Sequence, residues 1–333
     1  MSSLRQRGLP QTSGETTSAD SMQSRTNRKT CILCLQNPPI QNSHIVPKLV
    51  LKWILENAPV EHLRWSRIPN KPFQDGWKGD YLCMECEGRL STIENQFKTE
   101  FFDPIVNSKS AVVQYSDFLL PFSISLYLRH LRFSLDQDPT FKGAEALWDL
   151  SEQLRRQLFN FLYVGDYPDV HSYVVHLPFV DNSSFFEPGV NQYFLSVDGF
   201  WFDYHIPPDK VFYIGAVKLP MLQFVFGGEP LDVVTSDAEC RAELARAKIN
   251  RNGAFALTNL SQVILPGLLG EDYNKRAVDL RESVGNLSSK QTRKIVDEIT
   301  SHPNPESTIF HIAYEKDLKL AAFKEGVKQS AQQ

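Results

Sequence analysis

The chain has 333 residues, of which 42% are hydrophobic and 22% charged, a balance typical of a folded protein and not of a disordered or fibrous one. Lys and Arg number 35 against 39 Asp and Glu, and the net charge of −4 excludes a uniformly basic coat, although not a local basic patch. The sequence has no uncharged apolar run of about 18 residues and no apolar stretch near its start. We therefore expect a cytoplasmic protein without a membrane partner.

Composition separates three segments. Residues 1–29 are rich in Ser, Thr, Gln and Arg and nearly free of aromatic residues, so they are predicted to be a disordered arm. The arm carries five Lys or Arg and two acidic residues, a density that favours a solvated tail over a dedicated phosphate-binding arm. Residues 30–105 hold two cysteine pairs and form a candidate module. Residues 106–333 make up a larger body.

The first part of the body is predicted to be helical and the next part to be a set of strands. Pro121 fits the first turn of one helix, and a second has apolar residues at helical spacing: Leu147, Leu150, Leu154, Leu158 and Phe161. Strands are indicated by aromatic- or Val-rich runs at 170–180, 192–197, 200–206, 211–217 and 221–226. Asp198-Gly199 is predicted to be a tight turn between two of them.

The remaining body combines an acidic section with further helices. Residues 161–240 contain two Lys, no Arg and eleven Asp or Glu, so this surface would repel a phosphate backbone. We expect it to be structural or to serve as a platform for a protein partner. Capping patterns that begin at Ser236 and Ser288 predict two later helices, the second ending at His302.

Four of the five cysteines form two Cys-x-x-Cys pairs, Cys31–Cys34 and Cys83–Cys86. In an intracellular chain two such pairs indicate metal binding more than disulfide bonding. Four thiolates complete the tetrahedral shell that zinc prefers and leave no open position, so the predicted zinc is structural. Buried thiols or a redox pair are the alternative. The lone Cys240 is expected to be a buried or half-buried helix residue.

A Ser43-His44-Ile-Val-Pro-Lys motif lies between the two pairs, and Glu87 directly follows the second. With these features, residues 30–105 resemble the zinc-ribbon branch of the HNH, or ββα-metal, endonuclease superfamily. The resemblance implies that His44 ends the first strand of a hairpin and acts as the general base that activates a water against a phosphodiester. It also implies that Glu87 and Glu94, on the helix opened by the second pair, both face His44, and that Glu87 is the one to hold a catalytic Mg²⁺ or Mn²⁺.

Two positions depart from the family pattern. Ser43 stands where the family has an acidic or histidine metal ligand, and Lys78 stands where it has a central Asn. Asp80 and Asn70, in the intervening loop, are candidates to replace that Asn. Each site residue also has a purely structural alternative. His44 would orient a cysteine knuckle, Glu87 would be a first-turn acid stabilised by the helix dipole, and Glu94 would be a solvated helix residue.

The segment between the cysteine pairs combines cations with tryptophans. Phosphate contact is expected from Lys48, Lys52 and Lys78, and base stacking from Trp53, Trp65 and Trp77. The alternative, which is compatible with phosphate binding, is that the tryptophans form the core of a small metal domain.

Together these patterns predict an α+β fold: an N-terminal zinc-ribbon ββα-metal-like module, a helical connector, an antiparallel β section and helical C-terminal segments. The leading hypothesis is a metal-dependent HNH-like endonuclease that hydrolyses phosphodiester bonds in DNA, with RNA less favoured, and the resemblance suggests bacterial antiphage defence. Ser43 and Lys78 favour a different class, a non-catalytic zinc-ribbon protein that binds nucleic acid or protein. A third hypothesis is a zinc module that only fastens the N-terminus to a scaffold.

Overall fold

The structure of the chain is a computed structural model. The described residues are 30–58, 60–65, 68–73, 76–107, 112–137, 144–176, 201–205, 214–227, 238–256, 282, 285–308 and 315. The predicted arm at 1–29, the strand at 192–197, the Asp198-Gly199 turn and the Ser236 cap lie outside these residues.

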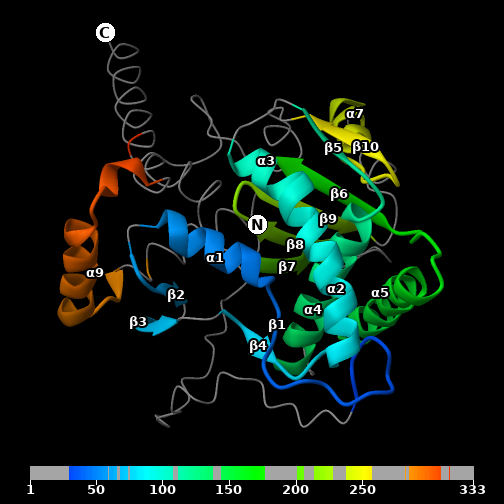
Figure 1. Cartoon of the computed structure of the whole chain (residues 1–333), viewed down its shortest axis with the longest axis horizontal. Coiled ribbons are helices and arrows are strands. Elements are labelled where there is room, and N and C mark those ends of the chain that lie inside the picture. Colours follow the sequence, from blue (N-terminus) through cyan, green and yellow to red (C-terminus); the bar gives the residue numbers. More distant parts are fainter. Residues whose placement is uncertain are drawn as a thin grey trace, which may run out of the picture.

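The N-terminal part consists of short strand pairs and two helices (Figure 1). Strands β1 (Ser43–His44) and β4 (Lys78–Gly79) pair antiparallel, with Ser43 opposite Gly79 and His44 opposite Lys78. Helix α1 (Lys48–Asn57) and the antiparallel pair β2 (Leu63–Trp65) and β3 (Ile68–Phe73) lie between them in the sequence. The strands around His44 are therefore joined by an inserted helix and a second strand pair, and not by a tight turn.

Helix α2 (Met84–Gln96) begins directly after Cys83 and continues through a π-helical segment (Phe97–Phe102) into α3 (Asp103–Val106). Leu90, Ile93 and Phe97 recur at helical spacing and are buried, which gives α2 an inward face. The wider π-helical turn follows this face, and both Phe101 and Phe102 are buried there. Beyond α3, β5 (Val112–Tyr115) pairs with β10 (Gly253–Ala256).

Helix α4 (Leu119–Gln137) lies at the centre of the molecule, between α2 and the large sheet (Figure 1). It also packs against α5 (Ala144–Tyr163), the second predicted helix. Phe122 of α4 stacks on Phe97 with 3.6 Å between ring centroids, and Tyr127 stacks on Phe226 at 4.3 Å. Because α4 is buried on nearly all sides, any charged side chain on it needs a partner inside the protein.

The large sheet has four antiparallel strands in the order β6-β9-β8-β7. They are β6 (His171–His176), β7 (Trp201–His205), β8 (Ile214–Leu219) and β9 (Leu222–Gly227), each within a run predicted to be a strand or extending one or two residues past it. Phe224 on one sheet face contacts Phe97 and Phe122, so this face packs on α4 and the end of α2.

The C-terminal described part contains α7 (Ala238–Ala247), α9 (Ser289–Ser301) and a 3₁₀ turn (Pro305–Ser307). Ser288 caps α9 as predicted, because its hydroxyl accepts from the Gln291 N–H at 3.4 Å, and the helix ends before His302. The Asn70 side chain donates to the Asn286 carbonyl and accepts from the Ser288 N–H. Asn70, one candidate for the missing family Asn, is thus engaged at the α9 cap.

The described elements form a mixture of helices and small antiparallel sheets, so the α+β class is confirmed. One hydrophobic core cluster runs from Cys31 to Phe255 and takes in α2, α4, α5 and the large sheet. Within the described part of the chain, no helix is both long and apolar enough to span a membrane.

Candidate functional site

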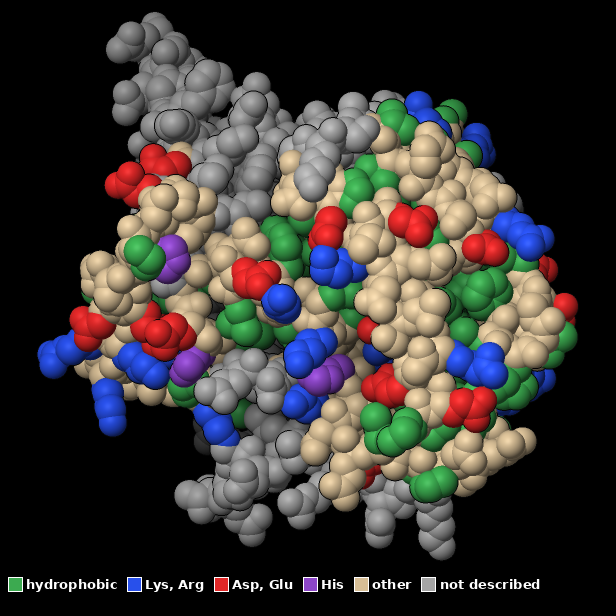
Figure 2. Space-filling view, viewed as in Figure 1, with side chains coloured by type: hydrophobic (Ala, Val, Ile, Leu, Met, Phe, Trp, Pro, Cys, Tyr) green, Lys and Arg blue, Asp and Glu red, His purple; other side chains and the backbone are tan. Residues whose placement is uncertain are grey.

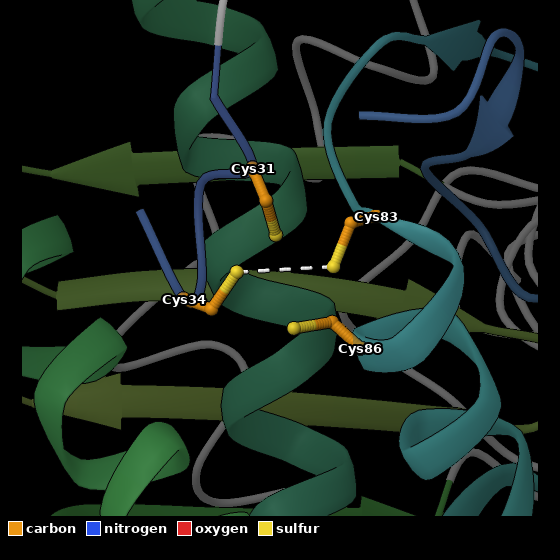
Figure 3. A group of neighbouring side chains, drawn as sticks. All are labelled: Cys31, Cys34, Cys83 and Cys86. Carbon is orange, nitrogen blue, oxygen red and sulfur yellow. Dashed lines mark hydrogen bonds between the residues drawn. The ribbon is translucent and has the colours of Figure 1, made fainter. Parts of the chain in front are cut away.

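The four cysteines of the two pairs meet at the start of α2, with their side chains directed toward a common centre (Figure 3). Their sulfur atoms all lie within 4.8 Å of one another, and the Cys34 and Cys83 sulfurs are 3.8 Å apart. Cys31, Cys83 and Cys86 are buried. Four sulfur atoms this close match the ligand shell of a single ion. The predicted clustering is confirmed, and the cysteines are placed to bind a metal ion such as zinc.

Backbone hydrogen bonds hold the two knuckles together. The Ile32 N–H donates to the Tyr81 carbonyl, and the Ile40 N–H donates to the Leu82 carbonyl, each at 2.8 Å. Leu35, which closes the first knuckle, has a φ of +59°, and its N–H donates to the Cys31 carbonyl. The cysteines are therefore positioned by the backbone before any ion is considered.

Electrostatics in the cluster favours a cation. A hydrogen bond from Cys86 is the main cause that lowers the pKa of Cys31 to about 5, while the same contact and burial raise the pKa of Cys86. Burial also raises the pKa of Cys83. The neighbouring thiols thus cannot all ionise at neutral pH on their own, and a bound cation removes this conflict because it stabilises every thiolate at once.

His44 lies on β1, half-buried, next to a second group of predicted site residues. The hydroxyl of the adjacent Ser43, which is 2% exposed, donates to Glu87 Oε1 at 2.8 Å. Ser43 therefore holds the Glu87 carboxylate of α2 against the strand that carries His44. Burial raises the pKa of Glu87 above its usual value, while Arg129 and the Ser43 hydroxyl act in the opposite direction.

Gly79, opposite Ser43, is required by close packing. A Cβ atom at this position would lie 2.1 Å from Cε2 of Tyr81, whose side chain is fully buried. The Tyr81 ring has little freedom to move away, since its hydroxyl donates to Asp136 Oδ2 on α4 at 2.8 Å.

Arg129 of α4 joins this site, and the sequence reasoning missed it. Its side chain donates to the His44 carbonyl at 3.1 Å and to Glu94 Oε1 at 2.8 Å. It also donates to the carbonyl and the hydroxyl of Ser125, and Arg129 is only 2% exposed. A signal was present in the sequence: Arg129 interrupts an apolar helical run, and buried cations are rare unless they are paired.

The predicted nucleic-acid contacts fall into two groups. Lys48 and Lys52 are exposed on α1, where Lys52 pairs with Glu56 at 3.4 Å, whereas Lys78 is half-buried opposite His44. Figure 2 shows Lys and Arg side chains around a histidine on the face that carries α1, β1 and α2, with acidic side chains among them. This face is mixed in charge and is basic only locally.

Two of the three tryptophans, Trp53 and Trp77, are half-buried and pack against the hydrophobic core. Trp53 packs edge-on against Phe102 with 5.8 Å between centroids, and Trp77 stacks on Phe133 at 5.4 Å. This agrees with the alternative that tryptophans build the interior of the module. The Trp65 side chain lies outside the described residues.

Within the described part of the chain, no cage of three protein ligands surrounds His44. Among the described residues, the four cysteines are the only group of three or more His, Cys, Asp or Glu ligand atoms close enough to share an ion. The Glu94 carboxylate is paired with Arg129, and Asp80 Oδ1 accepts from the Asn42 N–H at 3.2 Å. Any divalent ion at His44 and Glu87 would need most of its ligands from water or substrate.

The chain was compared with protein-family models, with characterised proteins and with solved structures, and none of the three comparisons gives a significant match.

Proposed function

We propose that the chain is an HNH-like, metal-dependent endonuclease that hydrolyses phosphodiester bonds in DNA, with RNA as the less favoured substrate and bacterial antiphage defence as its setting. One observation carries the proposal. The three residues predicted for the site belong to one network, in which Ser43 beside His44 bonds to Glu87 and Arg129 joins the His44 carbonyl to Glu94.

Zinc is the metal proposed for the cysteine cluster. The donor set of four sulfur atoms suits zinc, and an ion closed in by four protein ligands has no position for substrate. Its role is then to fasten the first knuckle and β4 to the start of α2. This fixes the strand that carries His44 relative to the helix that carries Glu87.

His44 is proposed as the general base that takes a proton from the attacking water. Glu87 is the residue that would hold a catalytic Mg²⁺ or Mn²⁺, an ion whose charge would stabilise the phosphate as it is attacked. The small protein ligand set fits Mg²⁺, which keeps several waters and commonly binds through one or two carboxylates together with substrate phosphate. Lys78, opposite His44, and Lys48, at the start of α1, would contact the phosphate backbone.

Substitution of His44 tests the proposal. With Mg²⁺ or Mn²⁺ present, His44→Ala should lower cleavage of plasmid and single-stranded DNA by about two to four orders of magnitude, the usual contribution of a general base. Zinc content and melting temperature should stay near those of the wild type, because the four cysteines do not need His44. His62→Ala, a half-buried histidine of the same segment, is the matched control and should cut normally. Equal cutting by the wild type and His44→Ala would rule out this site.

The second candidate function is a non-catalytic zinc-ribbon protein that binds nucleic acid or another protein, the latter through the acidic 161–240 section. The specific observation in its favour is that Glu94 is engaged by Arg129 and that no three-ligand cage surrounds His44 among the described residues. It predicts DNA binding without metal-dependent cleavage, and His44→Ala would then reduce stability and binding together.

A further inference from the structure

Arg129 has more polar contacts at the His44 site than a structural ion pair needs. Its guanidinium group makes four hydrogen bonds, to the Ser125 carbonyl, the Ser125 hydroxyl, the His44 carbonyl and the Glu94 carboxylate. The Ser125 contacts fix the guanidinium on α4. The other two contacts reach β1 and α2, which are the two elements that carry the proposed site.

The chemistry of the guanidinium suits this arrangement. Its donors lie in one plane with fixed directions, so a single group can hold two acceptors at a set separation. A lysine ammonium keeps the charge but acts as a compact point donor, and it cannot reproduce this fork. Because Arg129 is 2% exposed, water cannot take over the lost hydrogen bonds.

We infer that Arg129 is a positioning residue for the proposed nuclease site, and that the site is completed by α4 of the body. Arg129 fixes the backbone of His44 relative to α2, and it holds Glu94 in an ion pair so that Glu87 is the carboxylate left for a divalent ion. This inference rests on the proposed function for its catalytic consequence. The geometric part, the link between α4 and the His44 strand, has a separate readout.

The test compares Arg129→Lys with Arg132→Lys in the full chain. Arg132 is the matched control, because it lies one turn further along α4, is 6% exposed and pairs with Glu152 of α5 instead of Glu94 of α2. Both changes keep a positive charge at a buried position. Arg129→Lys weakens the ion pair with Glu94, and Arg132→Lys weakens the ion pair with Glu152. Arg129→Lys should lower kcat for Mg²⁺-dependent plasmid cleavage about 10- to 100-fold, the order of loss known for partners that orient site residues through hydrogen bonds, with little change in KM. Arg132→Lys should lower the melting temperature by a similar amount to Arg129→Lys but leave kcat unchanged.

The geometric readout is the imidazole carbon NMR signal of His44, assigned by its absence in His44→Ala. It should shift in Arg129→Lys and stay in place in Arg132→Lys at the same pH. If the wild type cuts no DNA, the proposed function fails, and this NMR comparison alone decides whether Arg129 positions the strand. Should Arg129→Lys not fold, Glu94→Gln replaces it, since the neutral amide weakens the same ion pair without removing the arginine. The inference is overturned if the two arginine variants lose kcat in parallel with stability, or if the His44 signal moves in both or in neither.

Discussion

The cysteine cluster and the His44 site share helix α2, yet they draw on different parts of the chain. All four sulfur ligands come from two short knuckles, and the backbone of those knuckles holds them together. The His44 site combines β1, two turns of α2 and an arginine from a helix in the body. Each cysteine pair is built by local spacing, and the two pairs meet within residues 31–86, whereas the His44 site also needs an arginine from helix α4 of the body. The cluster and the site should therefore respond differently to substitutions and to pH.

The largest expected effect comes from breaking the cysteine cluster. Cys83→Ser should remove most of the bound zinc, about one ion per chain in the wild type, and unfold the N-terminal part, because binding of a structural zinc supplies folding free energy. Metal analysis and thermal melting measure both. Cys240→Ser, the remaining cysteine of the sequence and located on α7, is the matched control and should keep its zinc. A stable, zinc-loaded Cys83→Ser protein would contradict the cluster.

Acid should act on the helix that supports the His44 site. His130 on α4 is fully enclosed, and burial lowers its pKa from 6.5 to about 4. Below pH 6.5 the unfolded chain therefore binds a proton at His130 that the folded chain does not bind. The contribution of His130 to the unfolding free energy is fully present above pH 6.5 and is lost as the pH falls toward 4. Between pH 7.5 and 5 this one group should cost about 2 kcal/mol of unfolding free energy. Denaturant titrations should show that His130→Gln, although less stable at pH 7.5, loses less on acidification.

An effect of similar size is expected from the hydroxyl that holds Glu87. Ser43→Ala removes one buried hydrogen bond to a carboxylate and should cost about 1.5 to 3 kcal/mol of stability. If Glu87 serves the proposed metal, the variant should also need more Mg²⁺ for half-maximal cleavage. Ser151→Ala, which removes a hydroxyl from a fully buried serine on α5, controls for the loss of a serine hydroxyl in the interior. Identical Mg²⁺ dependence in the wild type and Ser43→Ala would show that Ser43 does not position Glu87.

Local patterns were sufficient to predict much of the fold. The spacing of the cysteines predicted their clustering, and the apolar runs at 170–180, 211–217 and 221–226 predicted strands where β6, β8 and β9 lie. The Ser288 cap and the end of α9 also follow from short-range chemistry. Apart from the meeting of the two cysteine pairs, these features depend on neighbours within a few positions, which a single sequence displays directly.

The rest depends on packing between distant segments. The sequence placed His44 and Glu87 near one another through a family resemblance, but nothing in their spacing shows that Ser43 bonds to Glu87. Arg129 lies far from both in the sequence, and only the burial of α4 brings it there. Asn70 was a candidate for the site and instead lies at the α9 cap, because β3 approaches a helix more than two hundred residues later.

Gly79 has a consequence for the evolution of this chain. A side chain at position 79 would overlap the Tyr81 ring, and that ring is held by Asp136. A single substitution at position 79 is therefore expected to destabilise the fold as long as Tyr81 is present. We expect homologous chains to vary at these two positions together, with a larger residue at 79 accompanied by a smaller one at 81.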